Sequence, residues 1–331
     1  MSQAMTIRVL SSTDLRRALP MPAAIETMKE AFVELSAGRV TMPTRAHIDV
    51  PDHDGTALFM PSYGARFGRI GVKIVNVFGA NGARGLPAIQ GLVCLFDSET
   101  GTPLALLNGT HLTALRTGAA SGAATDVLAR ADASTAAILG AGVQGRTQLE
   151  AVCAVRPIRK AWVYDVRPEA AEAFAEEMGA ALGAEVTAVS SARQAVREAD
   201  VICAATVSVR PVFADADLAP GTHINAIGSY QPHVQEIPAE TMQRALVVVD
   251  HRASALTETG DLIIPIEQGL MQESDVHAEL GEIVAGQVPG RTSEDEITLF
   301  KSVGVAIQDL AAATRALEQA QATGLGRIVE I

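Results

Sequence analysis

The stretch Thr135-Ala136-Ala137-Ile138-Leu139-Gly140-Ala141-Gly142-Val143-Gln144-Gly145 carries the strongest fold signal in this sequence. Its first five residues form an apolar run typical of a buried strand, and residues 143–155 have the pattern of a helix. The turn between them has the spacing G-x-G-x-x-G. A second strand then leads to Asp165, twenty residues past the last glycine. This strand, glycine turn, helix and strand together predict a dinucleotide-binding unit.

Each glycine of the turn has a separate task in such a unit. Gly140 allows the tight turn, Gly142 lets a pyrophosphate approach the backbone, and Gly145 allows the helix to pack closely on the strand. The pyrophosphate then binds to free N–H groups at the helix N-terminus. Asp165 would accept hydrogen bonds from the adenosine ribose and repel a 2′-phosphate, so NAD is favoured over NADP, and the nearby Arg167 moderates this preference. The predicted contacts of this part of the cofactor are Gly140, Gly142, Val143, Gln144, Gly145 and Asp165.

Strands and helices alternate in the sequence after this turn. Nearly continuous apolar strands that alternate with helices predict a parallel sheet covered on both faces. A long helical pattern also runs from Asp295 to Leu317. The expected strands are Ser134–Leu139, Ala161–Val166, Glu185–Val189, Val201–Ala205, His223–Ile227 and Leu246–Asp250, and the expected helices between them include Pro168–Gly179 and Ala192–Glu198.

The region before about Leu112 has a different pattern. A helix is expected from Pro22 to Gly38, and short strands separated by turn signals are expected at Thr56–Met60, Ile70–Val77 and Gly91–Asp97. These elements predict a mostly antiparallel sheet behind a helix. The fold class is therefore α/β, with a Rossmann-type doubly wound parallel sheet and a smaller α+β domain.

Length and charge exclude several classes of protein. The chain has 331 residues, enough for two domains, and its 26 basic and 38 acidic residues give a net charge of −12. This charge disfavours nucleic acid and membrane surfaces as partners. Three separate cysteines in apolar runs are typical of a reducing compartment, and we expect a cytoplasmic protein. No spacing of cysteine and histidine predicts a metal site.

Three cations in the region before the glycine turn lie in apolar surroundings. They are Arg45, Lys73 and Arg116. Lys73 is part of an apolar strand, where its ammonium either faces solvent or is paired with an anion, and the pattern alone leaves both alternatives open. Together the three cations suit a bound carboxylate, which arginine can hold through two parallel hydrogen bonds.

Several further motifs, spread in order from about residue 43 to 310, resemble those of the ornithine cyclodeaminase/μ-crystallin family. This family includes ornithine and lysine cyclodeaminases, alanine dehydrogenase-type enzymes, ketimine reductases and a lens protein that binds thyroid hormone. The motifs are Gly85–Gly91, Thr100–Leu106, Thr113–Thr117, Asn225–Ser229, Glu279–Glu282, Pro289–Arg291 and Phe300–Gly304.

The resemblance implies a domain division and a set of site residues. It implies an NAD-binding Rossmann domain over residues 119–309, and a substrate and dimerisation domain formed by residues 1–118 with 310–331, hence a homodimer. Arg45, Lys73 and Arg116 would bind the substrate carboxylate, with Val303 near the substrate. The remaining cofactor contacts that it implies are Arg116, Thr206, Ala226, Ile227, Gly228, Ser229 and Ser302.

Two departures from the family pattern bear on the reaction. Tyr230 stands where the cyclodeaminases have an aspartate for the substrate's amino groups, and Ala88 replaces a threonine. We therefore expect an NAD-dependent reductase of a small imino acid, or an amino-acid dehydrogenase running the same step backwards. An ornithine cyclodeaminase that releases ammonia and forms proline is one alternative, and a non-catalytic ligand-binding protein is another.

The expected catalytic residues are Lys73 and His233, either of which could handle the proton that accompanies hydride transfer, although for Lys73 the role of carboxylate anchor is favoured over that of acid. Histidine is the residue type suited to proton transfer near neutral pH, and His233 follows a strand of the predicted parallel sheet, although an exposed loop imidazole fits the same pattern. With Arg84, His233 also suggests a dicarboxylic imine such as iminosuccinate as a substrate.

Overall fold

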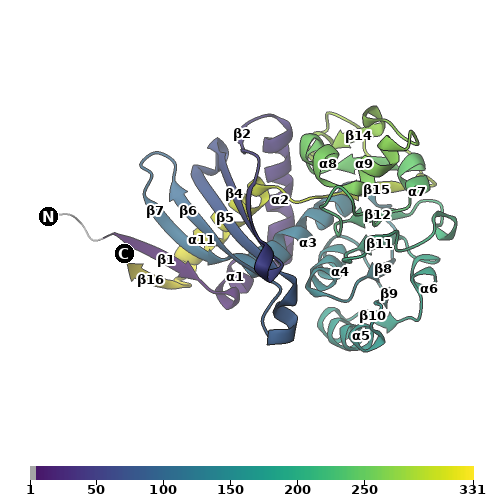
Figure 1. Cartoon of the computed structure of the whole chain (residues 1–331), viewed down its shortest axis with the longest axis horizontal. Coiled ribbons are helices and arrows are strands. Elements are labelled where there is room, and N and C mark those ends of the chain that lie inside the picture. The colour runs from purple at the N-terminus through teal and green to yellow at the C-terminus, as the bar shows by residue number, and fades with distance from the viewer. Residues whose placement is uncertain (1–4) are drawn as a thin grey trace. The chain divides into compact units, whose positions relative to one another are not determined.

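The computed structural model describes residues 5–331, which form two compact units (Figure 1). Unit 1 consists of the chain up to Arg116 together with Val305–Ile331, and unit 2 consists of Thr117–Gly304. Helix α3 (Gly109–Leu128) crosses the first boundary. Residues 305–309, which the expected division places in the nucleotide domain, belong to unit 1, because they begin the helix that covers its sheet.

Unit 2 is built on an eight-stranded sheet in the order β10-β9-β8-β11-β12-β15-β13-β14, and every pairing in it is parallel. The α/β fold with a doubly wound parallel sheet is thereby confirmed. The strands are β8 (Thr135–Leu139), β9 (Lys160–Tyr164), β10 (Glu185–Ala188), β11 (Val201–Ala204), β12 (His223–Ala226), β13 (Leu246–Val249), β14 (Val276–Glu279) and β15 (Thr298–Lys301).

Alternate residues of the central strands supply two hydrophobic cores, because successive side chains of a strand point to opposite faces. Ala137, Leu139 and Ile202 belong to one core, and Ile138 and Cys203 belong to the other. Helices therefore cover both faces. They are α4 (Val143–Val155), α5 (Pro168–Leu182), α6 (Ala192–Val196), α7 (Ala239–Arg244), α8 (Arg252–Glu258), α9 (Gly260–Glu267) and α10 (Leu280–Val284).

The helical pattern expected from Asp295 is wrong over its first part. Residues 298–301 form strand β15 in the middle of the sheet, and helix α11 (Ala306–Thr323) begins only after Gly304, which has a φ of +75°. All four residues of β15 are buried between β12 and β13. A four-residue strand that is buried on both faces has no alternation that distinguishes it from a helical turn.

Unit 1 contains a second eight-stranded sheet, in the order β16-β1-β7-β6-β5-β4-β2, with β3 paired to β4. All pairings are antiparallel except that of β1 with β7. The strands are β1 (Thr6–Leu10), β2 (Val40–Thr41), β3 (Ala46–Val50), β4 (Gly55–Gly64), β5 (Arg69–Phe78), β6 (Ile89–Asp97), β7 (Pro103–Asn108) and β16 (Arg327–Glu330).

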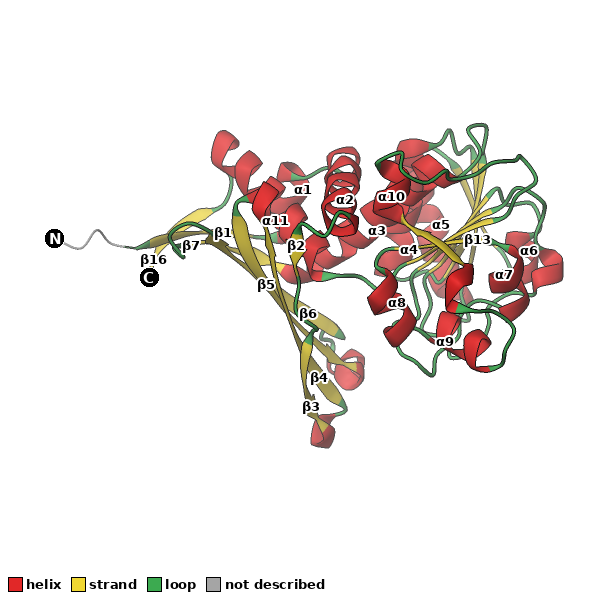
Figure 2. Cartoon of the chain, turned by 90° about the horizontal axis from the view of Figure 1, so that it is seen from above, coloured by secondary structure: helices red, strands yellow, loops and turns green. Residues whose placement is uncertain are grey.

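One face of this sheet is covered by helices. Helix α11 packs on β4, β5 and β6, and α2 (Met21–Ser36) and α1 (Ser12–Ala18) pack against α11 (Figure 2). Within the described residues of unit 1, no helix lies on the opposite face. Among residues 5–331, no helix is both long and apolar enough to span a bilayer.

Candidate active site

Two of the three predicted cations meet in the interior of unit 1. Nζ of Lys73, on β5, lies 2.7 Å from Oδ2 of Asp309, and Nε of Arg116, on α3, lies 3.0 Å from Oδ1 of the same carboxylate. Relative exposures are 3% for Lys73, 5% for Arg116 and 1% for Asp309. The alternative in which Lys73 faces solvent is thus wrong. Its ammonium is buried and paired with an acid.

Strand register and helix polarity bring these groups together. Lys73 pairs with Met60 on one side and Val93 on the other, and all three point to the face that α11 covers. Asp309 lies in the first turn of α11, where the helix dipole favours a negative charge. Strand β5 therefore places the ammonium of Lys73 next to the carboxylate that helix α11 carries at Asp309.

The third cation, Arg45, directly precedes β3 and is half-buried. Burial, together with the positive charges of Arg116 and Arg45, lowers the pKa of Lys73 to about 8 against the attraction of Asp309. Burial raises the pKa of Asp309, but Arg116 and Lys73 outweigh it and keep that pKa below its usual value. We call Arg45, Lys73 and Arg116 with Asp309 the cation cluster. Its two buried cations share one carboxylate.

Asp309 was not among the residues expected at the site. In the sequence it stands in the apolar stripe of a helix, which favoured a packing role for the whole segment. A single carboxylate in such a stripe was the signal that could have found it, since a charge is buried only when it is paired. Its neighbour Gln308 also belongs here, because its Oε1 accepts a hydrogen bond of 2.5 Å from Nη1 of Arg116.

The glycine turn of unit 2 has the geometry that a dinucleotide requires. Gly142 is the N-cap of α4, no side chain caps this end, and a Cβ at Gly142 would meet nothing within 4 Å. By contrast, a Cβ at Gly145 would lie 2.2 Å from the carbonyl oxygen of Gly140, whose φ is +102°. The turn is closed where helix and strand pack, and it is open where a pyrophosphate would approach the first N–H groups of the helix, at Val143 and Gln144.

Asp165 lies beside this turn, directly after β9. Its Oδ2 accepts a hydrogen bond of 2.9 Å from the Ala141 N–H, and its Oδ1 accepts one of 3.0 Å from the Arg167 N–H. A cavity of about 310 Å³ adjoins it, lined by residues of the β9–α5 and β10–α6 connections such as Val166 and Ser190. A carboxylate fixed next to a cavity at this edge suits the adenosine end of NAD.

The remaining predicted cofactor residues of unit 2 lie at the carboxyl ends of the central strands. Thr206 follows β11, Ala226 ends β12, Ile227, Gly228 and Ser229 follow it, and Ser302 follows β15. Three of these side chains are engaged within unit 2. Thr206 Oγ1 donates to Oε1 of Glu236 at 2.7 Å. Ser229 Oγ donates to the Val234 carbonyl at 2.6 Å, and Ser302 Oγ donates to Oδ2 of Asp250 at 2.7 Å.

Val303 and His233 differ in their surroundings. Val303 is buried, and its N–H donates to the same Asp250 oxygen at 3.0 Å, so its position is fixed by a carboxylate at the end of β13. His233 and Tyr230 are exposed in the segment after β12. Of the two expected catalytic residues, Lys73 is thus buried and His233 is exposed.

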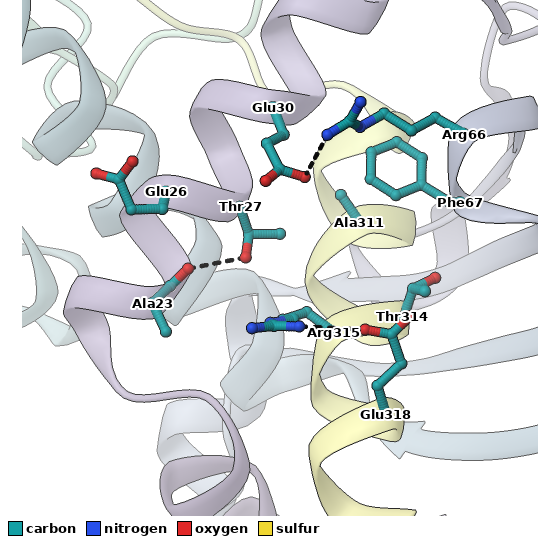
Figure 3. Close-up of a pocket in the computed structure, with 10 residues that line it drawn as sticks. All are labelled: Ala23, Glu26, Thr27, Glu30, Arg66, Phe67, Ala311, Thr314, Arg315 and Glu318. Carbon is teal, nitrogen blue, oxygen red and sulfur yellow. Dashed lines mark hydrogen bonds and ion pairs between the residues drawn. The ribbon is translucent and has the colours of Figure 1, made fainter.

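A larger cavity of unit 1 lies apart from these residues. It has a volume of about 640 Å³ and is lined by α2, α11 and the residues Arg66 and Phe67 (Figure 3). None of the predicted site residues lines it. Its two arginines lie near acidic neighbours, Arg66 at 3.5 Å from Glu30 and Arg315 at 3.4 Å from Glu318, so it presents no surplus charge to a carboxylate.

The sequence model of the ornithine cyclodeaminase/mu-crystallin family matches residues 5–324. The chain belongs to this family. A Delta(1)-pyrroline-2-carboxylate reductase of Bacillus cereus is 42% identical over 323 residues, which cover 97% of this chain and 99% of that protein.

Solved structures agree with this assignment. The Thermococcus litoralis Delta(1)-pyrroline-2-carboxylate reductase in complex with NADH and L-proline superposes with a TM-score of 0.94 at 46% identity, over 97% of this chain and 99% of that one. An archaeal alanine dehydrogenase dimer with bound NAD has a TM-score of 0.92 at 35% identity, over 99% of this chain and 100% of that one. This chain is an NAD-dependent oxidoreductase that acts on the carbon–nitrogen bond of a small imino or amino acid.

Proposed function

We propose that this protein reduces the cyclic imino acid Delta(1)-pyrroline-2-carboxylate to proline with NADH. The observation that carries the proposal is the cation cluster, in which Lys73 and Arg116 share a single buried acid in the interior of unit 1. A buried cation in excess of the acids around it is costly unless a ligand supplies the missing negative charge. The carboxylate of a small imino acid supplies it, and the B. cereus and T. litoralis relatives carry the name of this activity.

The cluster divides its work between anchoring and proton transfer. Arg45 and Arg116 hold the substrate carboxylate, since a guanidinium stays protonated throughout the working range and binds carboxylates through two hydrogen bonds. Lys73 donates the proton. Its pKa of about 8 lies close to neutrality, which is where a general acid works best. Asp309 fixes the ammonium and keeps it charged until the proton is used.

The imine carbon gains a hydride and the ring nitrogen gains a proton, so the C=N bond becomes a CH–NH bond. NADH, when bound, would supply the hydride and be oxidised to NAD+. Residues of unit 2 would hold it: the N–H groups of Val143 and Gln144 for the pyrophosphate, Asp165 for the adenosine ribose, and the segments after β11, β12 and β15. Val303, next to Ser302, is the residue of unit 2 that we expect near the substrate. The chain's own part in the step is to hold both reactants and to deliver the proton.

We also propose that the protein works as a homodimer through the sheet of unit 1. Three cross-strand rows on the face opposite α11 are apolar and half-buried or exposed. A contiguous apolar patch on an uncovered sheet face is typical of an interface. The archaeal alanine dehydrogenase is a dimer. The rows are Phe59–Ile74–Leu92, Pro61–Val72–Cys94 and Tyr63–Ile70–Phe96.

Substrate-dependent loss of NADH absorbance tests the proposal. Delta(1)-pyrroline-2-carboxylate should be consumed with equal amounts of NADH, and proline should be the product. Pyruvate with ammonia, and iminosuccinate, serve as comparison substrates, and both should react with a lower kcat/KM. If ornithine instead gives proline and ammonia with no net change in NADH, the protein is a cyclodeaminase. Tight NADH binding without turnover of any of these substrates would contradict an enzymatic role.

A further inference from the structure

Glu236 is a fully buried acid that none of the roles above employs. It lies in the segment between β12 and α7, and its carboxylate accepts three hydrogen bonds. Oε1 accepts from both the N–H and the Oγ of Thr206, each at 2.7 Å, and Oε2 accepts from the N–H of Gly228 at 2.9 Å. All three donors therefore belong to segments expected to contact the cofactor.

These donors come from two neighbouring loops. Thr206 follows β11 and Gly228 follows β12, and the two strands pair in parallel, so both loops emerge at the carboxyl edge of the sheet. The buried carboxylate of Glu236 connects the two loops, because one of its oxygens binds Thr206 and the other binds Gly228. It also explains the glycine, because a Cβ at Gly228 would lie 2.4 Å from Oε2 of Glu236 and 2.4 Å from the Thr206 carbonyl oxygen.

A second buried carboxylate, that of Asp261, binds the backbone at Glu236. Oδ1 of Asp261 accepts from the N–H groups of Glu236 and Ile237, at 2.6 Å and 2.9 Å, and Oδ2 of Asp261 lies 2.8 Å from the buried Nζ of Lys301. Burial raises the pKa of Glu236, whereas Lys301 and the donors of Thr206 lower it. The backbone of Glu236 is thus held in place independently of its own side chain.

We propose that Glu236 is a positioning residue for the cofactor, which holds the loops of Thr206 and Gly228 in the conformation that binds NADH. The inference rests on the proposed function, because it takes these loops as part of the NAD site. Glu236 acts through the two loops, and the side chain that contacts the ligand is not its own. Since the loops are braced before the ligand arrives, binding requires little ordering of the backbone.

Replacement of the carboxylate by an amide tests this role. In Glu236→Gln, an NH₂ group replaces one of the two oxygens. The NH₂ group cannot accept a hydrogen bond, so the side chain can accept from Thr206 or from Gly228 but not from both. We expect the Kd for NADH, measured by fluorescence titration, to rise about tenfold or more, because the loops would no longer be held in the binding conformation. The KM for the imino acid should change less than twofold.

Asp200 offers a matched control in the same sheet, at the amino ends of strands β8 and β11. Its carboxylate also braces backbone, because it accepts from the N–H groups of Ser134 and Thr135 at 2.8 Å and 3.0 Å. Asp200→Asn should lower the melting temperature without changing the Kd for NADH. If Glu236→Gln binds NADH within twofold of the unmutated protein, the inference is overturned. If the unmutated protein itself neither binds NADH nor turns over, the proposed function fails instead.

Hydrogen exchange on the unmutated protein gives a test that does not depend on a foldable variant. In the absence of NADH, the amides of Thr206 and Gly228 should exchange much more slowly than that of Val207, a residue that is 99% exposed. Exchange of all three at the same fast rate, with slow exchange of Thr206 and Gly228 only after NADH is added, would contradict a loop that is braced in advance.

Discussion

In unit 1, Lys73 and Arg116 share one buried acid, Asp309, whereas in unit 2, Glu236 and Asp261 lie around one buried base, Lys301. Among these groups, unit 1 therefore has one more buried cation than acid, and unit 2 has one more buried acid than cation. Backbone N–H groups supply donors to the surplus carboxylate of unit 2, so its network needs no ligand. Guanidinium and ammonium groups have only donors, so the surplus cation of unit 1 calls for an anion. We therefore propose that the cations of unit 1 bind the substrate and that the acids of unit 2 support the loops around them.

Removal of the ammonium of unit 1 should have the largest effect. Lys73→Met takes away the proposed proton donor, and we expect kcat/KM for the imino acid to fall about 10³-fold. The Kd for NADH should stay within twofold, because unit 2 is unchanged. Lys160→Met, on strand β9 and partly exposed, is the matched control and should leave kcat/KM unaltered. Retention of more than a tenth of the activity in Lys73→Met would contradict the comparison.

Neutralisation of the shared acid should come next. Asp309→Asn removes the attraction that raises the pKa of Lys73, so that pKa should fall below about 8. We expect a loss of kcat/KM of about 10- to 100-fold at pH 7.5, partly recovered at lower pH as Lys73 regains its proton. Glu318→Gln on the exposed side of the same helix should have no effect. A loss that is equal at every pH would show that Asp309 does not act through Lys73.

The pH dependence of the unmutated enzyme follows from the same group. Because burial lowers the pKa of Lys73 to about 8, the protonated acid is present below pH 8 and is lost above it. The kcat/KM for imine reduction should therefore decline about tenfold per pH unit above pH 8. The pH profile of Lys73→Arg should lack this decline at any residual activity, since arginine stays protonated. A profile that is flat to pH 10 would exclude Lys73 as the acid.

Substitution of Asp165 tests the proposed cofactor site of unit 2. Asp165→Ser removes the carboxylate that we propose binds the adenosine ribose. The Kd for NADH should rise about tenfold, and NADPH should bind better relative to NADH than before. The KM for the imino acid should not change. Glu176→Gln, exposed on helix α5, is the control. An unchanged ratio of the two cofactor affinities would place the ribose elsewhere.

The smallest effect concerns the stability of unit 2. His223 bonds to Thr298 and Asn225 in the core, and burial lowers its pKa to about 3. A histidine that is neutral in the fold but titrates near pH 6.5 when unfolded stabilises the protein fully above pH 6.5, and this stability is lost as the pH falls toward 3. The free energy of unfolding of unit 2 should decline by about 1 kcal/mol at pH 5.5. Urea titrations at several pH values check this, and His223→Gln should flatten the dependence.

Much of this fold could be predicted from local patterns. The glycine turn, its flanking strand and helix α4 were predicted within a residue of their observed bounds, because the signal lies in consecutive residues. Strand β15 was not predicted, since four buried residues have no alternation. Strands β1 and β16 were also missed. They pair with each other across more than 300 residues of chain, and no local pattern indicates that pairing.

Residue type and spacing along the chain were enough to establish the nucleotide unit, the family and the three cations. The placement of the charges required the folded protein. Asp309 faces Lys73 across 236 positions of sequence, and Thr206 donates to Glu236 across 30. Whether a charge is buried, and with which partner, depends on how elements distant in sequence pack together, and no pattern of neighbouring residues records that packing.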